Sequence, residues 1–246
     1  MTLFSGLADK AKKQNDNVRT DPFSVDLPTH PLTSLKNYVE RCNGLLKSFN
    51  LYSYDWEDCL YGETQSNDQK EHFVVPANDI VPRGLEILEQ CYKDGQDVVV
   101  SSTVDVTNPP GEYEQLQMPL IDFSVPSDLL SFRNVLNDDT FCVAFFKATG
   151  LLLEDFDIYS SGRSYHGYYR GLINKKAWEK YMLSLLTLPG IPGADYVPDC
   201  RWIGHRLLMG DGALRLTATH THYLHQPKLV SPVACSGAPA DPEIVF

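Results

Sequence analysis

The chain has 246 residues, of which 43% are hydrophobic, and a formal net charge of −11 at pH 7. This length and hydrophobic content allow a full buried core and exclude an intrinsically disordered protein. No apolar run reaches the length of a transmembrane helix and residues 1–5 show no signal-peptide pattern, so we expect a cytoplasmic protein with no membrane partner. The six cysteines contain no Cys-x-x-Cys pair, which argues against a zinc knuckle or a disulfide framework.

The first third of the chain predicts mainly helix. Residues 1–30 are polar and carry several prolines, which is typical of a loosely docked arm. Apolar residues at helical spacing predict an amphipathic helix over 33–49 and a second helix over 82–93. The mixed segment 51–81 predicts no regular element. We therefore expect residues 1–95 to form an N-terminal arm and helical region.

The next segment predicts two strands around a turn. Residues 97–106 and 113–125 read as strands, and the Asn-Pro-Pro-Gly sequence at 108–111 reads as the turn between them. Strand alternation places Asp122 and Ser124 on one face of the second strand, and Ile121, Phe123 and Val125 on the other. A buried, unpaired Asp is costly, so Asp122 needs a cation, a hydrogen-bond donor or a solvent-lined cleft.

The rest of the chain alternates helices and strands. Helices are predicted over 126–136, 140–149, 176–188 and 199–208, and strands over 156–160, 165–170 and 213–222. Gly150 ends the second of these helices, and Asp199 is the predicted N-cap of the last. We expect residues 96–225 to form the core and residues 226–246 to form an extended tail.

The turn between the strands at 156–160 and 165–170 is the most informative segment. Residues 161–166 read Ser-Gly-Arg-Ser-Tyr-His. Glycine and hydroxyl residues at this position give a tight turn with exposed backbone N–H groups, and Arg163 adds a guanidinium suited to phosphate. His166 adds a donor that can be neutral or charged near physiological pH. These parts suit a nucleoside triphosphate; the alternative is a polar turn whose Arg and His are solvated.

The distribution of charge supports a phosphate site in the same region. Residues 160–230 hold nine Lys/Arg and four Asp/Glu, a net charge of +5 inside a chain that is acidic elsewhere. Such asymmetry fits a local groove for phosphates. The alternative is ordinary helix surface charge, as for Lys175, Lys176 and Lys180.

An acidic strand, a Ser-Gly-Arg-x-x-His turn, an Asp before a helix and a Leu-Arg-Leu strand follow one another between about residues 97 and 220. This order resembles the catalytic core of the archaeo-eukaryotic primase superfamily, which includes primase–polymerases. The resemblance implies an α+β fold: a primase-like core with a mostly antiparallel, RRM-like sheet flanked by helices, beside the helical N-terminal region. It also implies binding of NTP or dNTP and of a DNA or RNA template.

The resemblance assigns roles to particular residues. Asp122 and Asp199 match the positions that bind Mg²⁺ or Mn²⁺, and together with His166 they form the implied catalytic set. The implied nucleotide-binding residues are Ser161, Gly162, Arg163, His166 and Arg215. Asp195 lies four residues before Asp199 and competes for its role.

The chain departs from the family pattern at Ser124. The first motif of the family has two acids spaced by two residues, and Ser124 stands at the second position, which resembles a one-aspartate branch. Chemistry with two metal ions needs more carboxylates, and a second ion would need Asp105, Asp128 or a partner's group. Three hypotheses follow: an active nucleotidyltransferase, a catalytically degenerate nucleotide- or nucleic-acid-binding protein of a bacterial defence or mobile-element system with a protein partner, and an unrelated scaffold.

Two further groups of side chains each allow two interpretations. His220 and His222 lie on one face of the last predicted strand, with His225 beyond it. That spacing suits either a transition-metal site or a polar, template-facing strand end. Trp56 and Tyr61 could stack on bases or pack into the core.

Overall fold

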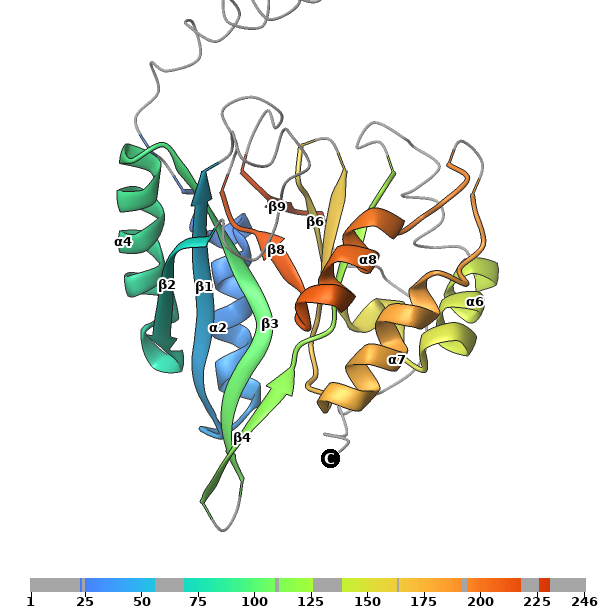
Figure 1. The fold of residues 1–246 in the computed structure, drawn as a ribbon, viewed down its shortest axis with the longest axis horizontal. Coiled ribbons are helices and arrows are strands. Elements are labelled where there is room, and N and C mark those ends of the chain that lie inside the picture. The colour runs from blue at the N-terminus through green and yellow to red at the C-terminus, as the bar shows by residue number, and fades with distance from the viewer. Residues whose placement is uncertain are drawn as a thin grey trace, which may run out of the picture.

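Two antiparallel sheets make up the fold of this computed structural model, and Figure 1 shows them side by side. The structure describes residues 23, 25–55, 69–108, 111–125, 139–162, 164–191, 194–217 and 226–230. Sheet A contains β1 (Leu46–Asp55), β2 (Gln69–Pro76), β3 (Gln96–Asn108), β4 (Glu112–Gln117) and β8 (Ala213–Arg215). Sheet B contains β5 (Leu120–Phe123), β6 (Phe156–Ser160), β7 (Tyr165–Tyr169) and β9 (Lys228–Leu229).

The strand orders show that the chain crosses between the sheets more than once. Sheet A runs β2-β1-β3-β4, with β8 also paired to β3, and sheet B runs β5-β7-β6-β9. β4 and β5 are separated only by Met118 and Pro119, yet they belong to different sheets. The C-terminal part of the described chain contributes β8 to sheet A and β9 to sheet B. The two sheets are therefore tied together by several chain segments.

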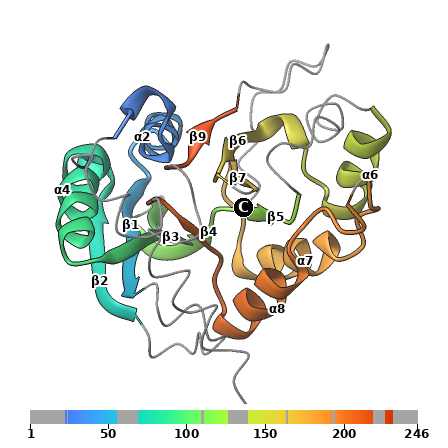
Figure 2. The same ribbon diagram turned by 90° about the horizontal axis from the view of Figure 1, so that it is seen from above.

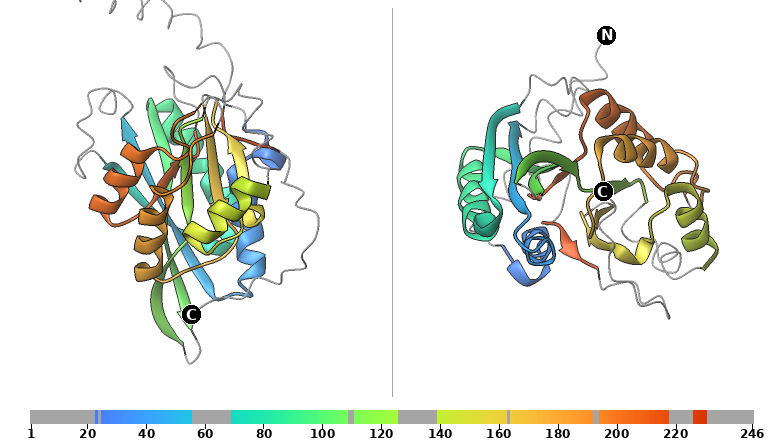
Figure 3. Two further views of the ribbon diagram at one scale, coloured as in Figure 1. Left: turned by 90° about the vertical axis from the view of Figure 1, so that its right-hand side faces the viewer. Right: turned by 90° about the horizontal axis from the view of Figure 1, so that it is seen from below.

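Helices pack against each of the two sheets, as Figure 2 shows from above. The α-helices are α2 (Pro31–Arg41), α4 (Ile80–Lys93), α6 (Asp139–Thr149), α7 (Lys175–Leu185) and α8 (Cys200–Met209). Short 3-10 helices are η1 (Leu27–Thr29), η2 (Ala77–Asp79) and η3 (Leu153–Asp155). α2 and α4 lie against sheet A, whereas α6, α7 and α8 lie on the outer side of sheet B (Figure 3).

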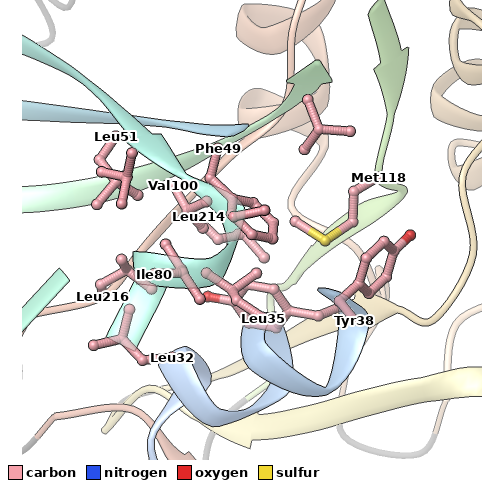
Figure 4. Packing of buried hydrophobic residues seen from close by; sticks show 14 of the residues in the cluster. Leu32, Leu35, Tyr38, Phe49, Leu51, Ile80, Val100, Met118, Leu214 and Leu216 are labelled. Atoms are coloured by element: carbon pink, nitrogen blue, oxygen red, sulfur yellow. The ribbon is translucent and has the colours of Figure 1, made fainter. Parts of the chain in front are cut away.

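Two apolar clusters correspond to these layers. In the first, Leu32 and Leu35 of α2 point toward Phe49 of β1 and Leu214 of β8 (Figure 4). The second joins sheet B to its helices and includes Trp178 of α7, which is fully buried. Burying this apolar surface is the main favourable contribution to folding.

Sheet B is buried on both faces because its alternate residues enter different clusters. Ile121 and Phe123 belong to the helix-side cluster, whereas Leu120, Tyr159 and Tyr168 belong to the cluster shared with sheet A. Strand alternation then places Asp122 and His166 on the face that is turned toward sheet A. The predicted separation of Asp122 from Ile121 and Phe123 is confirmed.

The predicted α+β class is confirmed, and so are most elements after residue 80. The predicted elements at 82–93, 97–106, 140–149, 156–160, 165–170, 176–188 and 199–208 correspond to α4, β3, α6, β6, β7, α7 and α8. Among the described helices, none is long and apolar enough to cross a lipid bilayer.

Three predictions in the first half were wrong. The helix predicted over 33–49 ends at Arg41, because Asn43 and Gly44 adopt left-handed φ values of 47° and 77° and β1 begins at Leu46. The mixed segment 51–81, to which no regular element was assigned, contains half of β1 and all of β2. The single strand predicted over 113–125 is broken into β4 and β5.

Other predictions lie wholly or partly outside the described residues. They are the helix at 126–136, the strand end after residue 217, and most of the tail, in which Lys228–Leu229 forms β9. The division into regions 1–95, 96–225 and 226–246 stays a prediction, and β1 and β3 pair across its first boundary.

Candidate functional site

The two predicted metal ligands stand opposite one another on adjacent extended segments. The backbone N–H of Asp199 donates to the Asp122 carbonyl at 2.8 Å, and the N–H of Ser124 donates to the Val197 carbonyl at 2.8 Å. Phe123 and Pro198 form an antiparallel bridge between these bonds. Residues 197–199 therefore pair along the edge of β5 that does not face β7. This register places Asp199, rather than Asp195, opposite Asp122.

His166 continues the same row on the other side of Asp122. The β5–β7 register pairs Asp122 with His166, and the β6–β7 register pairs His166 with Tyr159. Directly opposite residues in antiparallel strands have Cβ atoms about 4.5–5.5 Å apart. His166 Nε2 lies 3.8 Å from Asp122 Oδ1, which is longer than a hydrogen bond. Asp199, Asp122 and His166 form the acid–histidine row.

The Asp122 carboxyl has an unfavourable environment for its charge. Its pKa is raised from 3.8 to about 7, first by burial and then by the Asp199 carboxylate, while Arg215 acts in the opposite direction. The side chains of Asp122 and Asp199 keep exposures of 26% and 24%. A carboxyl whose charge is disfavoured, beside a second carboxylate, and with both side chains reachable by solvent, suits a divalent cation.

The two carboxylate oxygens of Asp199 have different surroundings. Its Oδ1 accepts the backbone N–H groups of Arg201 at 2.9 Å and Trp202 at 3.1 Å, so its predicted role as the N-cap of α8 is confirmed. This use of Oδ1 leaves Oδ2 as the atom better placed to meet a cation.

His166 is neutral in this environment. Burial lowers its pKa from 6.5 to about 3, and Arg215 acts in the same direction. The expectation that His166 changes charge near physiological pH was therefore wrong, because a side chain only 6% exposed cannot stabilise a second proton beside a guanidinium. Its Nδ1 is buried and makes no hydrogen bond to any described residue. A neutral imidazole offers one donor and one acceptor nitrogen.

The turn before His166 has the predicted bend. The Ser161 N–H donates to the Ser164 carbonyl at 2.8 Å, and Gly162 adopts φ 100°, a left-handed value that favours glycine. The Ser164 hydroxyl donates to the Phe123 carbonyl, which ties the turn to β5. Arg163 lies outside the described residues, so its predicted contact with phosphate stays a prediction.

Arg215 supports this turn from sheet A. Its guanidinium is buried and donates to the Thr217 carbonyl at 2.8 Å and to the Ser161 carbonyl at 3.3 Å. The side chain thereby links β8 to the turn between β6 and β7. These hydrogen bonds do not test the predicted contact of Arg215 with nucleotide. They show that the side chain supports the turn through the Ser161 carbonyl.

The candidates for a second metal site are less well placed. The Asp105 carboxylate accepts hydrogen bonds from Ser48 at 2.5 Å and Gln115 at 3.1 Å within sheet A. Asp128, the three C-terminal histidines, Trp56 and Tyr61 lie outside the described residues. Over the part of the chain that the structure describes, no group of three or more His, Cys, Asp or Glu residues could hold a metal.

Sequence reasoning did not include Tyr159 in the site. Tyr159 stands opposite His166 and extends the acid–histidine row across β6. The predicted hairpin contained the signal, because a turn at 161–164 fixes which residues of its two strands face each other.

A family model described as archaeo-eukaryotic primase 1D-like matches residues 86–228, which include the whole acid–histidine row. The chain therefore belongs to the archaeo-eukaryotic primase superfamily, as the order of its motifs implied. Membership associates it with nucleotides and a nucleic-acid template, and the superfamily generally uses divalent metals. No curated protein and no solved structure matches the chain. Its place in a one-aspartate branch stays a prediction.

Proposed function

We propose that the chain is a primase–polymerase-like nucleotidyltransferase that binds NTP or dNTP with Mg²⁺ or Mn²⁺ and acts on a DNA or RNA template. The observation that carries this proposal is the acid–histidine row, in which strand register places Asp199, Asp122 and His166 next to one another. Residues from three separate parts of the sequence, each matching one motif of the family, meet there.

Asp122 and Asp199 are the residues that would hold the cation. Mg²⁺ is commonly bound through one or two carboxylates together with substrate phosphates and water. A bound divalent cation polarises phosphoryl oxygens and offsets the charge that develops during nucleotidyl transfer. The raised pKa of Asp122 supports this assignment, because Arg215 and the ion pair of Arg201 with Asp199 at 3.8 Å do not offset the burial of Asp122 and the nearby Asp199 charge.

The turn at 161–164 and His166 would hold the triphosphate. Backbone N–H groups of a turn with left-handed residues suit anions, and Arg163 can bind two phosphate oxygens at once. The neutral His166 can donate one ring N–H without needing a second proton. Arg215 keeps the turn in place through the Ser161 carbonyl.

A second candidate is a primase-like protein that binds nucleotide or nucleic acid without catalysis, working with a protein partner in a bacterial defence or mobile-element system. The observation that favours it is Ser124, which is exposed two residues after Asp122 where the family pattern has an acid. Two-metal catalysis holds its ions about 3.5–4 Å apart, and two carboxylates are few for that purpose.

Primer-extension and de novo synthesis assays with labelled NTPs and dNTPs, in Mg²⁺ or Mn²⁺, test both candidates. We expect synthesis by the wild type that is lost in Asp122→Asn. Metal-dependent nucleotide binding without synthesis would favour the second candidate. Absence of both would contradict each of them.

Calorimetry of NTP binding tests the residue roles separately. Charge-assisted hydrogen bonds are worth about 1.5–3 kcal/mol, so Arg163→Ala should weaken NTP affinity about tenfold or more. Lys176→Ala, which removes an exposed positive charge from the nearby α7, is the control and should bind like the wild type. Equal affinities for the two variants would mean that the turn does not hold the triphosphate.

A further inference from the structure

Helix α2 carries a stripe of buried polar residues at every fourth position. The stripe consists of His30, which is the N-cap, together with Ser34 and Tyr38, and their exposures are 1%, 8% and 4%. Residues four apart lie one above the other on the same face of a helix. Burial of polar groups is costly unless they are hydrogen-bonded, so the partners of this stripe show what the helix face contacts.

The first residue of the stripe reaches the end of β8. His30 Nε2 donates to the Leu216 carbonyl at 2.8 Å. Leu216 directly follows Arg215, whose guanidinium supports the turn of the candidate site. The N-terminus of α2 is therefore bonded to the strand end that holds this arginine.

The second residue reaches sheet B beside the acid–histidine row. Ser34 Oγ donates to Asp157 Oδ2 at 2.7 Å and forms a further hydrogen bond with the Tyr159 hydroxyl. Asp157 is itself fixed, because its Oδ1 accepts Nε and Nη2 of Arg170 at 3.0 and 2.8 Å. Tyr159 stands opposite His166. One serine of α2 thus fixes the strand that neighbours His166.

The third residue reaches the chain just after β7. The Tyr38 hydroxyl donates to the Gly171 carbonyl. The apolar side of the same helix, with Leu32 and Leu35, packs into the core of sheet A (Figure 4). α2 is therefore attached to sheet A by packing and by the His30 hydrogen bond, and to sheet B and the segment after it by the hydrogen bonds of Ser34 and Tyr38.

The two sheets share no strand ladder. Gln117, at the end of β4, exchanges backbone hydrogen bonds with Ile173 beyond β7. Side-chain bonds from α2 and Arg215 add to this link and fix the hairpin relative to β8. We propose that α2 is a positioning element of the nucleotide site. Its polar stripe holds the β6–β7 hairpin, with the turn at 161–164 and His166, in place against Arg215. The family match begins at residue 86, so this helix lies outside it. The effect on nucleotide affinity rests on the proposed function, whereas the effect on the hairpin does not.

Nucleotide affinity gives the first test. Ser34→Ala and Tyr38→Phe each remove a hydroxyl with little change of volume. We expect each substitution to weaken NTP affinity about fivefold, because that is the change in affinity that the loss of one net hydrogen bond produces. Binding is measured at a temperature well below the unfolding midpoint. Ser34→Thr keeps a hydroxyl at this position and should bind NTP with the affinity of the wild type. Ile87→Val is the matched control. Ile87 belongs to α4, its side chain packs in the core of sheet A, and the substitution removes one buried methylene.

Amide hydrogen exchange without nucleotide gives the second test. In Ser34→Ala and Tyr38→Phe, amides of residues 158–168 should exchange faster while those of β1 and β3 keep wild-type rates. Ile87→Val should not show this pattern. If the wild type binds no nucleotide, the proposed function fails and the exchange data still decide the role of α2. Identical behaviour of the serine, tyrosine and isoleucine variants in both measurements would overturn the inference.

Discussion

The two sheets differ in what their buried faces contain. Sheet A has long strands, up to the 13 residues of β3, and its covered face packs apolar side chains against α2 and α4. Sheet B has strands of at most five residues and is covered on both sides, yet one covered face holds Asp122, Asp157 and His166. Polar groups in such a place reduce stability unless they are fully paired. Asp157 is paired with Ser34 and Arg170, whereas His166 lies 3.8 Å from Asp122, and these last two residues are the ones proposed to act in the nucleotide site.

Two buried histidines make the same contrast at the level of single atoms. Both nitrogens of His30 are engaged, since Nε2 donates to the Leu216 carbonyl and Nδ1 accepts the Leu32 N–H at 3.2 Å. His166 Nδ1 has no hydrogen-bond partner within the described ranges. A buried polar atom left unpaired costs about 1–3 kcal/mol, so it needs an explanation other than stability. A ligand that completes its bonding is such an explanation.

The largest predicted effect tests whether the two sheets form one folding unit. Phe49 of sheet A and Phe156 of sheet B are 0% and 1% exposed, and Phe→Ala at either site should lower the free energy of unfolding by about 3–5 kcal/mol. Because chain segments cross repeatedly between the sheets, each variant should show a single denaturant transition. Circular dichroism and tryptophan fluorescence should report the same midpoint. Two separate transitions would show that the sheets unfold independently.

A smaller effect is expected at Gly167 in the centre of sheet B. A Cβ there would lie 2.5 Å from Ile121 Cγ2 and 3.2 Å from Ile158 Cδ1. Gly167→Ala should therefore destabilise the protein by about 1–3 kcal/mol. It should also weaken nucleotide binding, because the displaced strand carries His166.

Gly204→Ala is the matched control for Gly167. A Cβ at Gly204 in α8 meets nothing within 4 Å. The substitution should stabilise the protein by about 0.5–1 kcal/mol through helix propensity and leave binding unchanged. The denaturant midpoints of the two variants and the wild type, measured under the same conditions, test this difference. Equal effects at both glycines would contradict the tight packing of sheet B.

Features encoded by neighbouring residues were predictable from the sequence. They include the Asp199 cap, the bend at Gly162 and the alternation that separates Asp122 from Phe123, since each depends on a few adjacent residues. The division of the 113–125 segment was not predictable, because both halves have the same strand period and only tertiary packing sends them to different sheets. The engagement of Arg215 with Ser161 likewise depends on contacts between distant segments.

Acid sensitivity should come partly from the fully bonded histidine. Burial lowers the pKa of His30 from 6.5 to about 4. The unfolded chain therefore binds a proton between these pH values while the folded chain does not. This histidine's contribution is complete above pH 6.5 and is lost as the pH falls toward 4, by about 1–2 kcal/mol between pH 7 and 5.

His30→Asn tests this contribution, since Asn can still cap α2 but does not titrate. Denaturation curves from pH 7 to 4.5 should be flatter for this variant than for the wild type. A wild-type slope in His30→Asn would assign the acid sensitivity to other groups, His166 first among them.

The smallest expected effect on stability is at Ser124, where the consequence for function is most informative. Ser124 is exposed and its N–H donates to the Val197 carbonyl, a bond that any side chain preserves. Ser124→Asp should therefore change the free energy of unfolding by no more than about 0.5 kcal/mol. The new carboxylate would share a face with Asp122, so repulsion should lower the metal-free stability slightly, and Mg²⁺ or Mn²⁺ should reverse that loss.

The same variant asks whether the missing acid limits catalysis. A third carboxylate beside Asp122 and Asp199 would help to hold a second ion, which stabilises the attacking and leaving oxygens together. Synthesis by Ser124→Asp should exceed that of the wild type, whereas the neutral Ser124→Asn should not. Both variants should be assayed for multi-nucleotide products in Mg²⁺ and in Mn²⁺. Robust synthesis by the wild type with no gain in Ser124→Asp would show that Asp122 and Asp199 suffice.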